Sequence, residues 1–398
     1  MPKPRTEKID IYQYEEQLQS VYRRIENSEI TEKNKKLIKE FLDYCFAEGL
    51  SVPRVIKYAT TLLSLARLLG KDFDKTTKQD IVRVVGKIER NSYSAWTKKD
   101  FKVTLKKFYK WLRQTDDYPE EVKWLKTTLK KSEEKLPEEL LTEEDIQKMV
   151  NAVNDVRDKA LIITLYESGA RIGEIASLRI KQVHFDEHGT VLIIKGKTGM
   201  RRVRLIASDP YLRQWVNAHP AKDDPEAPLW IKRNKKGVEP LDYASISKII
   251  KRAAKKAEIK KRVHAHLFRH SRATFLAKYL TEAQLCQYFG WAIGSEMASV
   301  YVHLSGRDMD EAILGLYGFK IKKEPVAKNI PKECPRCGYK NPSDAKFCSN
   351  CGLALSVEAM REIEEKEKLA EKLLKILEDE EVKQVIAKKL KILNSYDL

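Results

Sequence analysis

The chain has 398 residues, enough for two or three domains that each bury a core of their own. No apolar run reaches the ~18 residues that a membrane helix needs, and the first residues lack a signal peptide's apolar stretch. We therefore expect an intracellular, cytoplasmic protein with no membrane partner. Of the net charge of +18, residues 1–130 carry +9 and residues 142–319 carry +8. Two basic blocks favour a polyanion such as DNA as partner, although ribosomal or acidic protein partners would also fit.

Residues 8–130 predict an all-helical domain, because their apolar side chains recur at helical spacing. Gly49 and Gly70 are expected to end two of these helices. A further helix, residues 98–112, has one apolar face and one face rich in lysine. Such a face can simply be solvated, but the charge of the domain favours contact with phosphates. The lysines proposed for this contact are Lys98, Lys99, Lys102 and Lys106.

Residues 131–141 are polar and contain a proline, so they are interpreted as a linker between domains. Thr142 can cap the next helix, and Asp145 stands at the capping-box position. Residues 142–319 predict a mixed α/β domain. It includes a hairpin whose strands, near Val191–Gly196 and Arg202–Ile206, flank a turn that contains Lys197.

Four of the six cysteines form two Cys-x-x-Cys pairs separated by ten residues. In an intracellular protein this spacing indicates a metal site rather than disulfides, and four thiolates suit structural zinc. The predicted zinc ribbon spans residues 331–354, and its modest charge leans slightly toward protein rather than DNA contacts. Residues 356–398 predict a charged C-terminal amphipathic helix, which we hypothesise mediates subunit contacts. The predicted zinc ligands are Cys334, Cys337, Cys348 and Cys351.

Three short segments carry the clearest signal for a function. Residues 165–178 read LYESGARIGEIASL, residues 266–274 read HLFRHSRAT, and YFGW at 288–291 is followed by VYVH at 300–303. Together with the hairpin, these motifs resemble the catalytic domain of the tyrosine recombinase family, which includes phage integrases and Xer-like proteins. The resemblance spans about residues 142–310, with a weaker match over the helical N-terminal half, which would be the core-binding domain.

The resemblance implies a site-specific recombinase that cuts and rejoins DNA through a 3′-phosphotyrosine, with neither ATP nor a catalytic metal. Two guanidinium groups would bind the charge that gathers on the phosphate oxygens in the transition state. A phenol, with an ordinary pKa near ~10, needs this field and a base to become a nucleophile. The implied roles are phosphate binding by Arg171, Arg269 and Trp291, nucleophile by Tyr301, general base by His266, and proton donor by Lys197.

Several of these assignments have rivals within the sequence. Lys195 and Arg201 lie close to Lys197, and His264 lies close to His266. Tyr288 and Tyr317 are alternative nucleophiles, but the spacing of Tyr301 from Trp291 favours Tyr301. Most family members carry histidine where Trp291 stands, and an indole can donate a hydrogen bond but cannot shuttle protons. Glu174 is expected to hold the fold or orient Arg171, and His270 and His303 are expected to be structural.

A basic run before His266 is proposed to bind the DNA backbone through Lys251, Lys255 and Arg262. The resemblance further implies four protomers on two DNA duplexes, a Holliday junction intermediate and a location at the nucleoid. Similar ribbons in archaeal proteins suggest an archaeal mobile element. Two rivals remain: a type IB topoisomerase, which uses a similar set of residues, and a DNA-binding protein without catalytic activity.

Overall fold

The computed structural model describes residues 9–128, 139–196, 199–232, 237–304, 329–380, 382–383 and 385–386, with only the backbone for residues 302–304. The chain divides into two compact units, residues 1–136 and 137–398. The predicted linker, 131–141, spans this boundary, and its residues 131–138 lie outside the described part of the chain.

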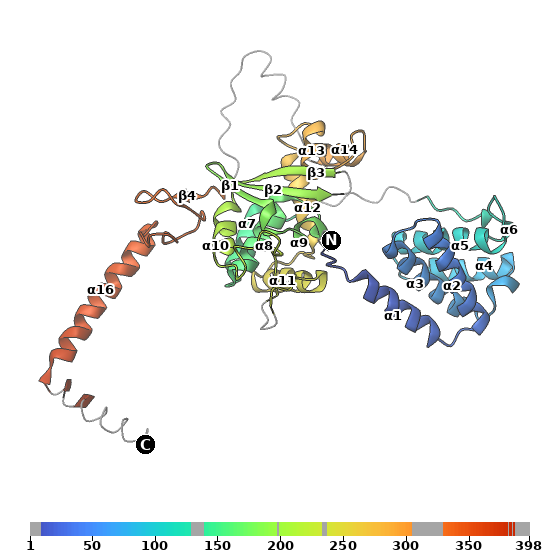
Figure 1. Cartoon of the computed structure of the whole chain (residues 1–398), viewed down its shortest axis with the longest axis horizontal. Coiled ribbons are helices and arrows are strands. Elements are labelled where there is room, and N and C mark those ends of the chain that lie inside the picture. The colour runs from blue at the N-terminus through green and yellow to red at the C-terminus, as the bar shows by residue number, and fades with distance from the viewer. Residues whose placement is uncertain are drawn as a thin grey trace, which may run out of the picture. The chain divides into compact units, whose positions relative to one another are not determined.

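The first unit is all-helical, as the sequence predicts (Figure 1). Its central helix, α3, packs against α1, α2, α4 and α5 and ends at Gly70, whose φ of 67° suits glycine. The aromatic ring of Phe108 lies in the middle of the core, with ring centroids 5.2 Å from Phe41 and 4.7 Å from Phe73. The helices are α1 (Tyr14–Glu26), α2 (Glu32–Ala47), α3 (Val52–Leu69), η1 (Phe73–Lys75), α4 (Lys78–Arg90), α5 (Ala95–Leu112) and α6 (Glu120–Lys123).

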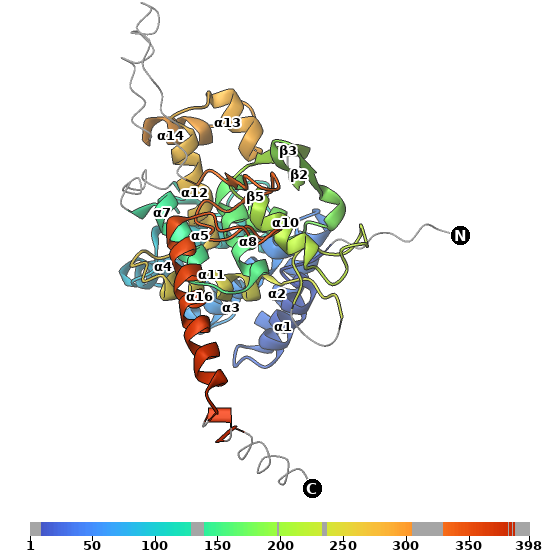
Figure 2. The same ribbon diagram turned by 90° about the vertical axis from the view of Figure 1, so that its left-hand side faces the viewer.

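The second unit begins with the predicted capping box, in which Thr142 and Asp145 exchange hydrogen bonds at the start of α7. In the two views, α13 and α14 lie together at one end of this domain and α11 at the other (Figures 1 and 2). Its helices are α7 (Glu143–Asn151), α8 (Val156–Ser168), α9 (Ile172–Ala176), η3 (Ile180–Gln182), α10 (Asp209–Asn217), α11 (Tyr243–Lys256), α12 (Ala265–Leu276), α13 (Glu282–Phe289) and α14 (Met297–Leu304).

Helix α8 is the core helix of this domain, because nearly all of its side chains are buried. It packs against α7, α10, α12 and the sheet. The predicted hairpin is confirmed: β2 (Gly189–Gly196) pairs antiparallel with β3 (Gly199–Leu205). A third strand, β1 (Val183–Asp186), joins the other edge of β2. The sequence reading missed it, because its alternating, half-buried side chains form only a four-residue pattern.

The chain then forms a small ribbon with two short strands, β4 (Lys332–Glu333) and β5 (Lys340–Asn341). Helix α16 (Val357–Glu378) follows and has one buried residue, Ala359, among the residues described there. The sequence predicted a helix over residues 356–398, of which residues 387–398 lie outside the described part. Among the helices that the structure describes, none has the length and apolar character needed to span a bilayer.

Candidate active site and zinc ribbon

Arg171 is held at the start of α9 by the glutamate three residues later. Gly169 caps the C-terminus of helix α8 with a φ of 54°, and a Cβ atom there would lie 2.3 Å from the Phe289 ring. The backbone N–H of Arg171 donates to Glu174 Oε2 at 2.9 Å, and its Nη1 donates to Glu174 Oε1 at 3.0 Å. The Glu174 side chain is buried, whereas that of Arg171 is 36% exposed. Arg171 is therefore anchored through its backbone N–H and one guanidinium nitrogen, while its side chain stays partly exposed to a ligand.

Arg269, on α12, is buried and bound by backbone carbonyls. Its Nη1 donates to Gly169 O at 3.0 Å, and its Nη2 donates to Phe289 O at 2.8 Å. Burial and, next, the positive charge of Arg171 lower the pKa of Arg269 to about 10. The Arg269 guanidinium thus remains charged at neutral pH, and its repulsion from Arg171 favours an anion beside the pair.

Tyr301 lies on α14 and is 3% exposed. Its ring stacks on that of Trp291, with centroids 5.3 Å apart and planes 2° from parallel. Its hydroxyl forms a short hydrogen bond with Nδ1 of His270. Burial raises the pKa of Tyr301 to about 12, although the charge of Arg269 partly opposes this rise. The phenol is therefore protonated at rest and has an imidazole against its oxygen.

The two histidines of α12 lie together but differ in their relation to Tyr301. His266 is exposed, and its ring meets the His270 ring edge-on with centroids 4.4 Å apart. His270 contacts the Tyr301 hydroxyl, a contact that sequence reasoning missed when it interpreted His270 as structural. The spacing offered a signal, because residues four apart share one face of a helix.

The hairpin candidates occupy different environments. Lys197 lies outside the described residues, and Lys195 is exposed opposite Met200. Arg201 is buried, and its Nη2 donates to Glu174 Oε2 at 2.7 Å. The rival nucleophile Tyr288 is buried and donates its hydroxyl proton to the Glu167 carbonyl at 2.8 Å, whereas Tyr317 lies outside the described residues.

Several of the lysines proposed to bind DNA contact other groups of the protein. In the first unit, Lys102 lies 2.6 Å from Glu89, and Lys98 donates to the Glu89 carbonyl at 2.7 Å. Lys99 lies over the Trp96 ring, and Lys106 over the Tyr118 ring. In the second unit, the proposed contacts are exposed on and after α11: Lys251, Lys255 and Arg262.

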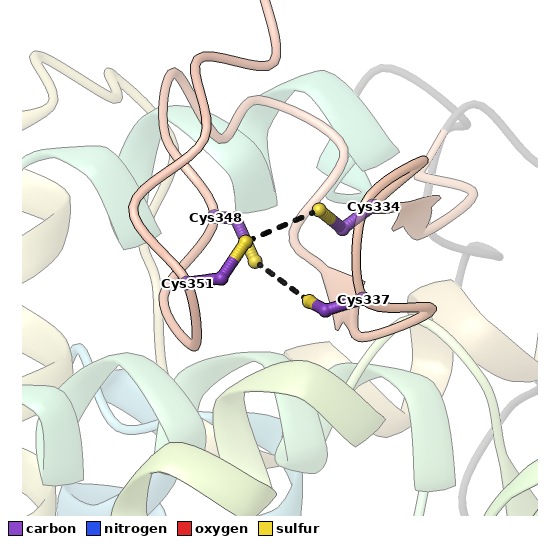
Figure 3. A group of neighbouring side chains, drawn as sticks. All are labelled: Cys334, Cys337, Cys348 and Cys351. Carbon is purple, nitrogen blue, oxygen red and sulfur yellow. Dashed lines mark hydrogen bonds between the residues drawn. The ribbon is translucent and has the colours of Figure 1, made fainter.

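The four ribbon cysteines point toward one another (Figure 3). The sulfur atoms of Cys334 and Cys351 are 3.6 Å apart, and those of Cys337 and Cys348 are 3.7 Å apart. A tetrahedral ion with Zn–S bonds of about 2.3 Å needs sulfur separations of about 3.8 Å, so the cluster fits zinc.

Neighbouring groups also support thiolates at this cluster. Hydrogen bonds from the backbone of Tyr339 and the side chain of Asn350 lower the pKa of Cys337. Asn341, fully buried, donates to Cys348 Sγ at 3.5 Å and accepts from the Ser349 N–H. These groups orient the ligands from outside the metal sphere.

Comparison with known proteins agrees with this arrangement of motifs. A model described as "Phage integrase family" matches residues 139–307, and one described as "Phage integrase, N-terminal SAM-like domain" matches residues 38–116. Together they span more than half of the chain. The chain belongs to the phage integrase family. A zinc-ribbon model matches residues 334–355, so this integrase-family chain carries a zinc ribbon as predicted.

Curated relatives of this integrase-family chain are tyrosine recombinases. It is 25% identical to tyrosine recombinase XerA of Pyrococcus furiosus, over 70% of this chain and 93% of the relative. It is 24% identical to tyrosine recombinase XerC of Alcanivorax borkumensis, over 70% and 93%.

Solved structures share the fold. XerH bound to palindromic difH substrate in a post-cleavage complex has a TM-score of 0.53 and 20% identity, covering 78% of this chain and 98% of that chain. A lambda integrase dimer bound to a COC′ core site has a TM-score of 0.54 and 16% identity, covering 73% and 80%. The predicted fold class is therefore confirmed.

Proposed function

We propose that this chain is a site-specific DNA recombinase that breaks and rejoins strands through a 3′-phosphotyrosyl bond to Tyr301. The observation that carries the proposal is the hydrogen bond between the Tyr301 hydroxyl and His270. The Tyr301 ring also stacks on the Trp291 ring, with centroids 5.3 Å apart, and the positive charge of Arg269 acts on the phenol. A nucleophile, a proton acceptor and cationic groups in one place are what transesterification of a phosphodiester requires.

In the proposed reaction, the Tyr301 oxygen attacks the scissile phosphorus and the bond from phosphorus to the 5′ oxygen breaks. The phenolic proton passes to the histidine pair, because a phenol with a pKa of about 12 cannot ionise unaided at neutral pH. Arg171 and Arg269 bind the non-bridging oxygens as their charge grows. Lys197 gives a proton to the leaving 5′ oxygen. Rejoining reverses these steps, so the energy of the broken bond is kept in the phosphotyrosine.

The proposed partners are double-stranded DNA and further copies of the same chain. Among the solved structures that share the fold are a lambda integrase dimer bound to a core site and a lambda integrase tetramer bound to a Holliday junction. We expect a tetramer during strand exchange, working at the nucleoid of an intracellular compartment. The match to a Pyrococcus XerA is in keeping with an archaeal mobile element.

A suicide-substrate assay tests the nucleophile. Duplexes that wild-type protein binds are first selected from a random library and then nicked beside the bound site, so that a released fragment traps the covalent product. We expect a protein–DNA adduct that survives denaturation, disappears with Tyr301→Phe and persists with Tyr317→Phe. Tight binding without an adduct from wild-type protein would instead support the rival in which the chain only binds DNA.

The same substrates separate recombination from topoisomerase activity. Two duplexes with the selected site should yield recombinant products, and Tyr301→Phe should abolish them. Relaxation of supercoiled DNA without exchanged products would favour the type IB topoisomerase rival.

A further inference from the structure

Arg201 on β3 is a buried arginine with no role in the reaction described above. Its side chain is 7% exposed, its Nη2 donates to Glu174 Oε2 at 2.7 Å, and its Nε donates to the Tyr288 carbonyl at 2.9 Å. Its third donor, Nη1, is buried and has no hydrogen-bond partner among the residues that the structure describes. Burying a guanidinium is costly unless it is paired, so these contacts must be substantial to keep it there.

Glu174 is shared between Arg201 and Arg171. One carboxylate oxygen, Oε1, accepts from Arg171 Nη1, and the other, Oε2, accepts from Arg201 Nη2 and from the Arg171 backbone N–H. The carboxylate is therefore held from two sides, by α9 and by β3. A long, partly exposed side chain such as that of Arg171 keeps one orientation only when its anchor is itself fixed.

Arg201 also reaches the C-terminal end of α13. It binds the Tyr288 carbonyl, while Arg269 binds the next carbonyl, that of Phe289. Free carbonyls at the end of a helix favour cations. Trp291, two residues beyond Phe289, stacks on Tyr301. Arg201 thus joins β3 to the segment that supports the nucleophile's ring.

Gly196 packs directly against this pair. A Cβ atom at position 196 would lie 2.7 Å from Glu174 Oε1 and 3.0 Å from Arg201 Nη1. Gly196 pairs with Gly199 at the end of the hairpin, and Lys197 is the next residue in the chain. A Cβ atom here would displace these two side-chain ends, so glycine lets the hairpin backbone lie against Glu174.

We propose that Arg201 is a positioning residue for strand cleavage, which fixes Arg171 through Glu174 and ties the β2–β3 hairpin to the end of α13. This inference rests on the proposed recombinase function. It explains why one acidic group stands among three arginines, because Glu174 orients two of them while leaving a net positive charge for the phosphate.

The arrangement predicts a dependence on pH. The pKa of Glu174 is lowered, although burial by itself would raise it. The hydrogen bond and the charge of Arg201 outweigh burial, and the hydrogen bonds from Arg171 lower the pKa further. The charged groups facing the carboxylate are Arg171 on α9, Arg201 on β3 and Arg269 on α12. Without Arg201, Glu174 should take up a proton at a higher pH and release its hold on Arg171.

The test compares Arg201→Met and Arg201→Lys with a matched control, Arg204→Met. Arg204 stands on the same strand but pairs with Asp186 at the surface. Single-turnover adduct formation on the selected suicide substrate is measured across the acid range, alongside DNA binding and thermal stability. Arg201→Met should slow cleavage about 10- to 100-fold with nearly unchanged DNA binding, as losses of supporting groups often do. Arg201→Lys should recover part of the rate, because it keeps the charge without the two-armed geometry.

The acid limb of the rate profile should move to higher pH in Arg201→Met and stay in place in Arg204→Met. The inference would be overturned if Arg201→Met left both the cleavage rate and the acid limb of its pH profile unchanged. It would also be overturned if the cleavage rate fell equally at every pH and the melting temperature fell with it. A carboxyl ¹³C NMR titration, assigned with Glu174→Gln, reads the pKa of Glu174 without DNA. A raised pKa in Arg201→Met supports the inference and an unchanged one refutes it, whereas absence of any wild-type adduct would refute the recombinase function alone.

Discussion

The hydroxyl of Tyr301 is hydrogen-bonded to Nδ1 of His270, the residue directly after Arg269. One helix, α12, therefore supplies two groups that act on Tyr301. The charge of the Arg269 guanidinium opposes the rise in the pKa of Tyr301, and the His270 imidazole contacts its hydroxyl. His266, one turn earlier, meets the His270 ring edge-on. The pair offers a path for the phenolic proton from a buried oxygen to the exposed His266.

His270→Ala is accordingly expected to slow adduct formation about 10²-fold or more, in the range that general bases contribute. His266→Ala should slow it as well, and the double variant should lose little more than His270→Ala if the two act in series. A substrate whose 5′ leaving oxygen is replaced by sulfur needs no proton donor and should not rescue His270→Ala. Rescue by that substrate would assign His270 to the leaving group and contradict its place at Tyr301.

The buried tyrosines predict the behaviour of the catalytic domain in alkali. Burial raises the pKa of Tyr166, Tyr288 and Tyr301 to about 12, with nearby arginines opposing the rise. An unfolded tyrosine ionises near ~10, so the stability from neutral burial is complete below that pH and is lost as pH rises toward 12. The melting temperature should therefore fall steeply between about pH 10 and 12. Absorbance near 295 nm should show these three phenols titrating late, and ionisation of all tyrosines near pH 10 without unfolding would contradict it.

Local motifs predicted much of this molecule because each encodes its own geometry. The Cys-x-x-Cys pairs sufficed for the ribbon, and Thr142 with Asp145 sufficed for a helix start. The motif around Arg171 also indicated Glu174 as its partner, which is the contact found.

Contacts between distant segments could not be predicted in the same way. Arg201 reaches Tyr288 across 87 positions, and Arg269 reaches Gly169 across 100. Both arginines donate to backbone carbonyls. Every residue has a carbonyl, so no residue type in the sequence indicates such a contact. Alternation along the hairpin could not separate Lys195 from Lys197, and the lysines of α5 appeared free although Glu89 engages two of them.

Zinc is expected to stabilise the fold of the ribbon and not that of the catalytic domain. Cys348→Ser should lose the metal, about one zinc per chain, and unfold residues 331–354, because metal binding and folding of such ribbons are coupled. The matched control is Arg336→Ala, an exposed change between two ligands that should keep zinc. Metal analysis and limited proteolysis give the readout. Full zinc content in Cys348→Ser would contradict a four-thiolate site.

The C-terminal helix is predicted to mediate contacts between subunits. Helix α16 exposes a series of apolar side chains that a charged solvated helix does not need. They include Leu369, Leu373, Leu374, Ile376 and Leu377. Deleting residues 356–398 should leave DNA binding by single protomers and reduce assembly of higher complexes on paired sites, as measured by native gel and light scattering. Unchanged assembly of the shortened chain would count against this role.

Glu167 is expected to be the most costly single carboxylate to remove from the catalytic domain. Its two oxygens accept from the backbone N–H groups of Ile206, Ala207 and Ser208 at 2.7–3.0 Å and from the Ser208 hydroxyl at 2.6 Å. These bonds fix the turn between β3 and α10 against the end of α8.

Glu167→Ala would leave those donors without an acceptor, at a cost of about 2–4 kcal/mol in the free energy of unfolding. Glu167→Gln keeps one good acceptor and should lose less. Denaturant titration of both variants gives the order. Because α8 ends at the Gly169 carbonyl that binds Arg269, Glu167→Ala should also slow cleavage at temperatures where the protein is still folded. A stable Glu167→Ala with normal cleavage would show that water satisfies the turn equally well.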